Sequence, residues 1–159
     1  MMLWRVVNKS LPIHAELIKR GINCPIICPR CHLKMETINH LFMECTYSVK
    51  VWFGSQLNIK KIYQPVQDFT TMITDNILHQ KRDIIIQLAA LTYNLWHARN
   101  QAIFEDTFVP KACIIQRAQT SVQKYLQAKE KTPEAQQHSG HTSNESHNNN
   151  IRQDSRGSK

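Results

Sequence analysis

The second half of the chain carries apolar residues at helical spacing. Between residues 82 and 104 they recur every three or four positions, at Ile84, Leu88, Leu91, Leu95 and Ala98. That period predicts one long helix over 82–104. After a break at 106–109, Pro110 suits the first turn of a last helix. We expect this helix to complete a C-terminal hairpin and to bury five side chains: Ile115, Ala118, Val122, Tyr125 and Leu126.

Shorter helices are predicted in the first half, where strand-like alternation is hard to find. One is expected over 13–20, where Gly21 suits the position after the last turn. Another begins after Thr37, a suitable N-cap, and a third covers about 47–57. A fourth is marked by apolar residues at Phe69, Met72, Ile73 and Ile77. The pattern predicts an all-α fold.

The end of the chain has a different composition. From residue 132 to 159 the only aliphatic residues are Ala135 and Ile151, among many Gln, Asn, Ser and His. Such a segment buries too little apolar surface to offset its conformational entropy, so we expect disorder. Three regions are therefore predicted: 1–61, a helical extension over 62–131, and a low-complexity tail over 132–159.

The positive charge is concentrated in the first of these regions. The whole chain has a formal charge of +8, and residues 1–61 hold nine Lys and Arg against three Asp and Glu, which gives +6. A basic surface favours phosphate-rich partners. Simple solubility is the alternative explanation of the same charge.

Four of the five cysteines also lie in this region, and three of them form a pattern with a histidine, Cys28-x2-Cys31-x8-His40-x4-Cys45. No signal peptide is visible, and no apolar run approaches the roughly 20 residues of a membrane span. We therefore expect an intracellular protein, nuclear or cytoplasmic, whose thiols stay reduced. Three thiolates and one imidazole suit one structural Zn²⁺. Reduced cysteines without metal are the alternative.

Two further residues compete as ligands. Cys24 lies four residues before Cys28, and His32 is adjacent to Cys31. Cys24 needs a wider turn, and His32 would bind from beside another ligand. The sequence leaves both open, whereas Cys113 is expected to belong to the core.

These residues belong to a longer set of motifs: Trp4-Arg5, Leu11-Pro12, Leu17, Arg20-Gly21-Ile22, Cys28-Pro29-Arg30-Cys31, Glu36-Thr37, His40-Leu41-Phe42, Cys45, Val51-Trp52, then Leu95-Trp96-His97-Ala98-Arg99-Asn100 and Ile103-Phe104. The set resembles the zinc-binding domain that follows the reverse transcriptase in LINE-type, non-LTR retrotransposon polyproteins, especially those of plants. The resemblance covers about residues 1–130. It implies zinc ligands at the same four positions: Cys28, Cys31, His40 and Cys45.

Two residues depart from that family's pattern, and neither is a candidate ligand. Ile13 stands where the family usually has a small hydroxyl N-cap, and Thr46 replaces a common proline. The sequence also lacks a Tyr-x-Asp-Asp polymerase signature and a ribonuclease-H-like region. The resemblance therefore implies a fragment or a detached copy of an element's coding region.

No catalytic motif is found, so a non-catalytic zinc module that assists RNA or single-stranded DNA binding is expected, with no small-molecule substrate. The candidate phosphate contacts are basic residues of the first region: Arg5, Lys9, Lys19, Arg20, Arg30 and Lys34. Trp4 and Trp52 are expected in the core rather than stacked on bases. The alternatives are a zinc-stabilised protein-interaction module, with a reverse transcriptase domain as partner, and a retroelement relic without function.

Overall fold

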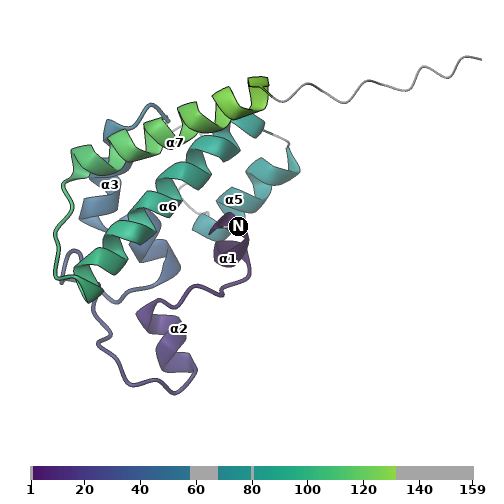
Figure 1. Ribbon diagram of the computed structural model, residues 1–159. Helices are drawn as coiled ribbons and strands as arrows, with labels where there is room; N and C mark the ends of the chain where they lie inside the picture. The colour runs from purple at the N-terminus through teal and green to yellow at the C-terminus, as the bar shows by residue number, and fades with distance from the viewer. Residues whose placement is uncertain (1, 58–67, 80, 132–159) are drawn as a thin grey trace, which may run out of the picture.

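The computed structural model describes residues 2–57, 68–79 and 81–131, which form an all-helical fold (Figure 1). The elements, in order, are α1 (Met2–Val7), α2 (His14–Lys19), the π-helix η1 (His40–Glu44), α3 (Thr46–Gly54), α5 (Phe69–Leu78), α6 (Arg82–Phe104) and α7 (Lys111–Lys131). The described residues contain no strand, only one isolated antiparallel bridge between Ile27 and Met35. The predicted all-α fold class is confirmed, while the predicted tail over 132–159 lies outside the described residues.

The predicted C-terminal hairpin is present, because α6 and α7 lie side by side (Figure 1). The bounds of α6 are those predicted from apolar spacing. Its buried face consists mainly of the predicted residues Leu88, Leu91, Leu95 and Ala98. None of the described helices is long and apolar enough to cross a membrane.

The predicted buried face of α7 is partly wrong. Ile114 and Ala118 are the buried residues of this helix, whereas Tyr125 and Leu126 are 46% and 42% exposed. In the second half of α7, Val122 and Leu126 border a cavity of about 330 Å³ between α7, α6 and the segment that follows α3. The last turns of α7 are therefore less closely covered than its first turns.

The start of α2 shows how the first half compensates for weak local signals. Ile13 occupies the N-cap position without a side-chain cap, as its apolar side chain predicts. Glu36 replaces the missing cap from a distance: its carboxylate accepts the backbone N–H of His14 at 2.8 Å, and its carbonyl accepts that of Ala15 at 3.2 Å. At the other end, Gly21 has a positive φ of 79° and ends the helix as predicted.

Aromatic residues from three elements meet in the core. Phe42 of η1 stacks on Phe69 of α5 with ring centroids 4.9 Å apart, and Trp52 of α3 lies 6.3 Å from Phe69. Trp52 is buried as predicted, but Trp4 is 60% exposed. The short helix α1 buries Leu3 and Val6, so the side chain between them faces outward.

One core connects the regions that the sequence separates near residue 61. The buried cluster runs from Leu3 and Val6 in α1 to Ile114 and Ala118 in α7. The predicted boundary itself falls within 58–67, outside the described residues. Over the described residues, the N-terminal region and the hairpin therefore share a hydrophobic core.

Candidate metal centre

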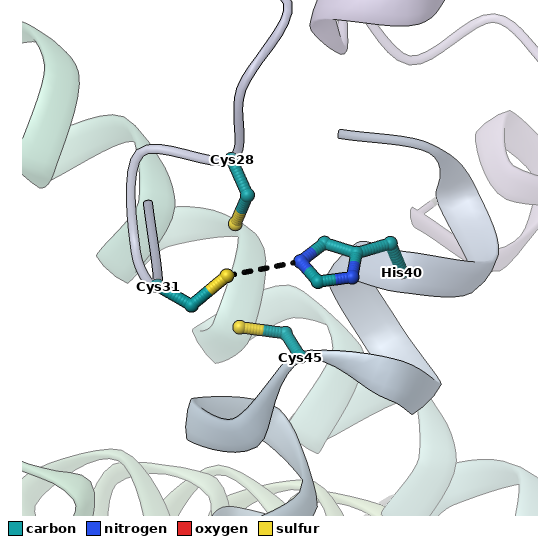
Figure 2. A group of neighbouring side chains, drawn as sticks. All are labelled: Cys28, Cys31, His40 and Cys45. Atoms are coloured by element: carbon teal, nitrogen blue, oxygen red, sulfur yellow. Dashed lines mark hydrogen bonds between the residues drawn. The ribbon is translucent and has the colours of Figure 1, made fainter. Parts of the chain in front are cut away.

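The four residues of the cysteine–histidine pattern meet in one place, although they come from two separate segments (Figure 2). Cys28 and Cys31 lie on a turn before η1, His40 begins η1, and Cys45 follows it. Their possible ligand atoms all lie within 4.8 Å of one another. Cys28, His40 and Cys45 are buried, and Cys31 is half-buried. The group is close enough to hold one metal ion.

The first pair is held by a tight turn. The backbone N–H of His32 donates to the carbonyl of Cys28 at 3.0 Å, and the N–H of Cys28 donates to the carbonyl of Lys34 at 2.8 Å. His32 takes a positive φ of 56° to complete this turn. Because the chain reverses here, both sulfur atoms face the same side.

The second pair is held by a π-turn rather than by the α-helical geometry expected from the sequence. Thr37 acts as the predicted cap, because its hydroxyl accepts the backbone N–H of His40 at 3.0 Å. Helical residues 38–39 follow, and the register then widens to π over His40–Glu44. The N–H of Cys45 donates to the carbonyl of His40, five residues earlier, at 2.7 Å. This wider turn brings residues five apart to one side, and π-turns of this kind are frequent at functional sites.

The ring of His40 points its Nε2 at the sulfur atoms. Nε2 lies 3.2 Å from the Sγ of Cys31 (Figure 2). The other ring nitrogen, Nδ1, is buried and has no hydrogen-bond partner among the described residues. Nε2 is therefore the nitrogen placed to join the three sulfurs around an ion.

The thiols also show that the site is suited to a cation. A hydrogen bond from Cys28 lowers the pKa of Cys45 to about 5. The same bond, together with burial, raises the pKa of Cys28. One thiol thus keeps its proton so that its neighbour can ionise. A divalent cation among the sulfurs stabilises all three thiolates, and three thiolates with one imidazole are a typical structural zinc set.

The two competing ligands are not part of this group. The Sγ of Cys24 lies 3.8 Å from the carbonyl oxygen of His14, and His32 is exposed. Among the described residues, the cluster of possible metal ligands contains only the four predicted positions. Cys113, which was expected in the core, is partly buried and packs against the hydrophobic core.

The candidate phosphate contacts fall into two groups. Five are exposed: Arg5, Lys9, Lys19, Arg20 and Lys34. Arg30 differs from the prediction, because its side chain is only 8% exposed and donates to two backbone carbonyls. It is not available to contact a phosphate group. Lys19 also pairs with Glu16 at 2.8 Å on the surface.

A buried ion pair that the sequence analysis missed ties the metal-binding segment to α6. The carboxylate of Glu36 accepts from Nε of Arg99 at 2.8 Å and from its Nη2 at 2.6 Å. Both side chains are almost fully buried, and Nδ1 of His14 lies 3.4 Å from the same carboxylate. Such bidentate pairs fix two elements in one geometry. The signal available in the sequence was one acidic residue, Glu36, in one motif and one basic residue, Arg99, in another. Charged residues are ordinarily expected on the surface, so the two were not paired.

Comparison with known proteins agrees with this site. Residues 1–52 match the family described as zinc-binding in reverse transcriptase, and this range includes all four candidate ligands. No curated protein and no solved structure matches the chain. Over residues 1–52 the chain is therefore similar to the zinc-binding region of reverse transcriptases.

Proposed function

We propose that Cys28, Cys31, His40 and Cys45 bind one structural Zn²⁺ in a non-catalytic module that assists the binding of RNA or single-stranded DNA. The observation that carries the proposal is the convergence of three sulfurs and one imidazole nitrogen within 4.8 Å. Four protein ligands complete a tetrahedral zinc site and leave no open position for an activated water. The match to a zinc-binding region, as opposed to the polymerase itself, supports the same view.

The module is proposed to derive from a LINE-type, non-LTR retrotransposon, in which a reverse transcriptase domain precedes it. The support comes from motifs beyond the matched range, in the run from Leu95 to Asn100. One residue of this run, Arg99, holds Glu36 inside the matched range. Because Arg99 of the later motif and Glu36 of the earlier motif form one buried ion pair, each motif needs the other in the folded module.

The nucleic-acid part of the proposal rests on charge. Residues 1–61 carry +6, and one zinc with three thiolates contributes −1, which leaves about +5. Arg5, Lys9, Lys19, Arg20 and Lys34 supply exposed positive charge. With no base-reading element recognised, phosphate contacts should carry most of the affinity, with little sequence preference.

A titration of a labelled single-stranded oligonucleotide against the full chain, at several salt concentrations, tests this role. With three or four phosphate contacts, log affinity should fall with log salt at a slope of about −2 to −3, roughly −0.7 per contact. Changing Arg5, Lys19, Arg20 and Lys34 together to Ala should flatten the slope. The matched control removes four exposed charges from α7: Arg117, Lys124, Lys129 and Lys131.

Zinc content should be unchanged in both quadruple variants. Equal losses of affinity would mean that net charge alone attracts the strand. Failure to bind even at low salt would remove the nucleic-acid role. The better account would then be a zinc-stabilised interaction module whose partner is a reverse transcriptase domain, a role compatible with exposed apolar side chains on α7 such as Tyr125 and Leu126.

A further inference from the structure

Arg30 occupies an unusual position for a charged residue, inside the turn between Cys28 and Cys31. Its side chain crosses to the other half of the molecule, where Nη1 donates to the carbonyl of Ala98 at 2.6 Å. Nη2 donates to the carbonyl of Val109 at 3.3 Å. These acceptors lie near the end of α6 and in the connection that leads to α7. The metal-binding turn is thus attached to the hairpin by one guanidinium group.

Two aromatic rings enclose that group. The guanidinium carbon lies 3.7 Å from the ring centroid of Tyr47 and 4.9 Å from that of Phe108. The two rings meet edge to face at 5.6 Å, and the hydroxyl of Tyr47 donates to the carbonyl of Val109. The planar cation lies over the faces of both rings, which is a favourable place for Arg and a poor one for Lys.

This buried charge has no carboxylate partner in the part of the chain that the structure describes. Among the described residues, none lies within ion-pair distance of Arg30, and its Nε–H has no hydrogen-bond partner. Arg99 provides the contrast, because both of its Glu36 contacts are to a full negative charge. Carbonyls and ring faces offer only partial charges, and a buried cation is costly unless a counter-charge lies near.

The nearest negative charge along the chain is the thiolate cluster, because Arg30 lies between Cys28 and Cys31. Arg30 lies two residues after Cys28 and one before Cys31, and its guanidinium lies over the ring of Tyr47, two residues after Cys45. Three thiolates with one Zn²⁺ carry a net charge of −1, which would itself be costly to bury without a cation. The cluster and the guanidinium therefore each provide the charge that the other requires.

From this geometry we propose that Arg30 is the counter-charge of the metal–thiolate cluster and couples metal binding to the packing of the hairpin. The proposal rests on the zinc site proposed above. Arg30 is a positioning residue, because it acts on the ligand turn and its charge and does not bind the metal. Metal binding should then increase the hydrogen-exchange protection of the end of α6 and of the connection before α7, although both lie far from the ligands in sequence.

The test compares the full-length protein with Arg30→Met, Arg30→Lys and Arg20→Met, which removes an exposed arginine. Zinc affinity is measured by competition with a chromogenic chelator. Loss of an outer-shell partner typically weakens metal binding about 10-fold to 100-fold, so Arg30→Met should fall in that range. Arg30→Lys retains the charge without the planar guanidinium, so its zinc affinity should lie between those of the wild type and Arg30→Met. Arg20→Met should bind zinc like the wild type.

Two measurements separate this role from general support of the fold. Leu88→Ala destabilises the core from the first half of α6, so it shows how zinc affinity changes with stability alone. The absorption spectrum of the Co²⁺ form shows whether the three-thiolate coordination persists in Arg30→Met. We expect an unchanged ligand set and an affinity loss well beyond that of Leu88→Ala.

Hydrogen exchange measures the coupling directly. On metal removal, wild-type protein should lose protection at residues 98–110, and Arg30→Met should already lack it in the metal-bound form. The role of Arg30 would be overturned if Arg30→Met bound zinc as tightly as Arg20→Met, or if its loss of zinc affinity only equalled that of Leu88→Ala. Either result would leave the proposed zinc site itself intact. Wild-type protein that binds no zinc would overturn the proposed zinc site itself.

Discussion

The two halves of the protein stabilise their helices in different ways. Residues 2–57 contain four helical elements of only 6, 6, 5 and 9 residues. The helices α6 and α7 have 23 and 21 residues and pack along each other. Isolated helices shorter than about 12–15 residues are marginal in water. The short elements therefore depend on contacts from elsewhere, whereas the hairpin has long apolar faces of its own.

Those external contacts include apolar packing in the shared core and a small number of specific polar bonds. Glu36 caps α2 and pairs with Arg99, and Arg30 joins the metal-binding turn to the end of α6. The side chain of Asn39 accepts the first backbone N–H of α5, from Phe69, at 2.8 Å. In the first half, polar contacts at defined points and one metal site thus add to the apolar packing of the shared core, whereas the hairpin packs along two long helices. The difference predicts that single polar changes matter most in the first half.

Removal of zinc is the largest expected change and tests whether the halves are independent. Structural zinc contributes on the order of 10–16 kcal/mol in small zinc-finger peptides, comparable to the whole stability of a domain, about 5–15 kcal/mol. We expect a chelator to abolish protection over residues 26–54 and to weaken it at 98–110, the range that contains Arg99 and the carbonyls that Arg30 contacts. The half of α6 around Leu88 should retain more. Hydrogen exchange with and without chelator measures this.

The ligand variants Cys31→Ser and Cys45→Ser should behave like the chelated protein, and metal analysis should find their zinc lost. Acid should act likewise, because the thiolates must be deprotonated to bind metal. Undiminished zinc in both variants would contradict the ligand assignment. Loss of protection confined to residues 26–54 would show that the two halves are uncoupled.

Arg99→Met tests the second connection. Removing one partner of a buried pair leaves the other charge uncompensated and costs about 3–5 kcal/mol. Urea unfolding should therefore show a large loss, while the exposed change Arg117→Met on α7 should stay within about 0.5 kcal/mol. Adding Glu36→Gln to Arg99→Met should recover part of the loss, because no charge is then left unpaired. A loss no greater than that of Arg117→Met would contradict the importance of this pair.

The same contrast explains which features were predictable from the sequence. The bounds of α6 follow from the spacing of Leu88, Leu91, Leu95 and Ala98, since each local turn repeats the same signal. The four candidate ligands were found because metal chemistry restricts residue types and spacing. Their closure by a π-turn was not predictable, because a hydrogen-bond register leaves little trace in side-chain periodicity.

The partners of the buried charges were also not predictable. Arg30 and Arg99 meet acceptors more than 60 residues away along the chain. A single sequence gives no information on which distant elements become neighbours. The exposure of Tyr125 and Leu126 has a related cause: their apolar spacing continues the pattern of α7, but the helix is not closely covered there.

A local cap in the second half should have a moderate effect. Asp68 accepts the N–H of Thr71 at 2.7 Å at the start of α5, and this bond lowers its pKa. Asp68→Ala should cost about 0.5–2 kcal/mol. Because the folded pKa is depressed, the contribution is complete above the ordinary pKa of the carboxyl and is lost as pH falls through the folded value. Urea unfolding of both proteins at neutral and acidic pH checks this, and a loss that persists unchanged in acid would contradict it.

The smallest effects are expected at the end of α7, where apolar residues face solvent. Tyr125→Ser and Leu126→Gln should each change stability by no more than about 0.5 kcal/mol, as is usual for exposed positions. Ile114→Ala on the same helix is the matched contrast, because Ile114 is fully buried and its truncation should cost about 2–5 kcal/mol. Urea unfolding of the three variants compares them directly. Losses near that of Ile114→Ala at both exposed positions would mean that this face of α7 is covered in solution, so that the hairpin, like the first half, depends on contacts beyond its own two helices.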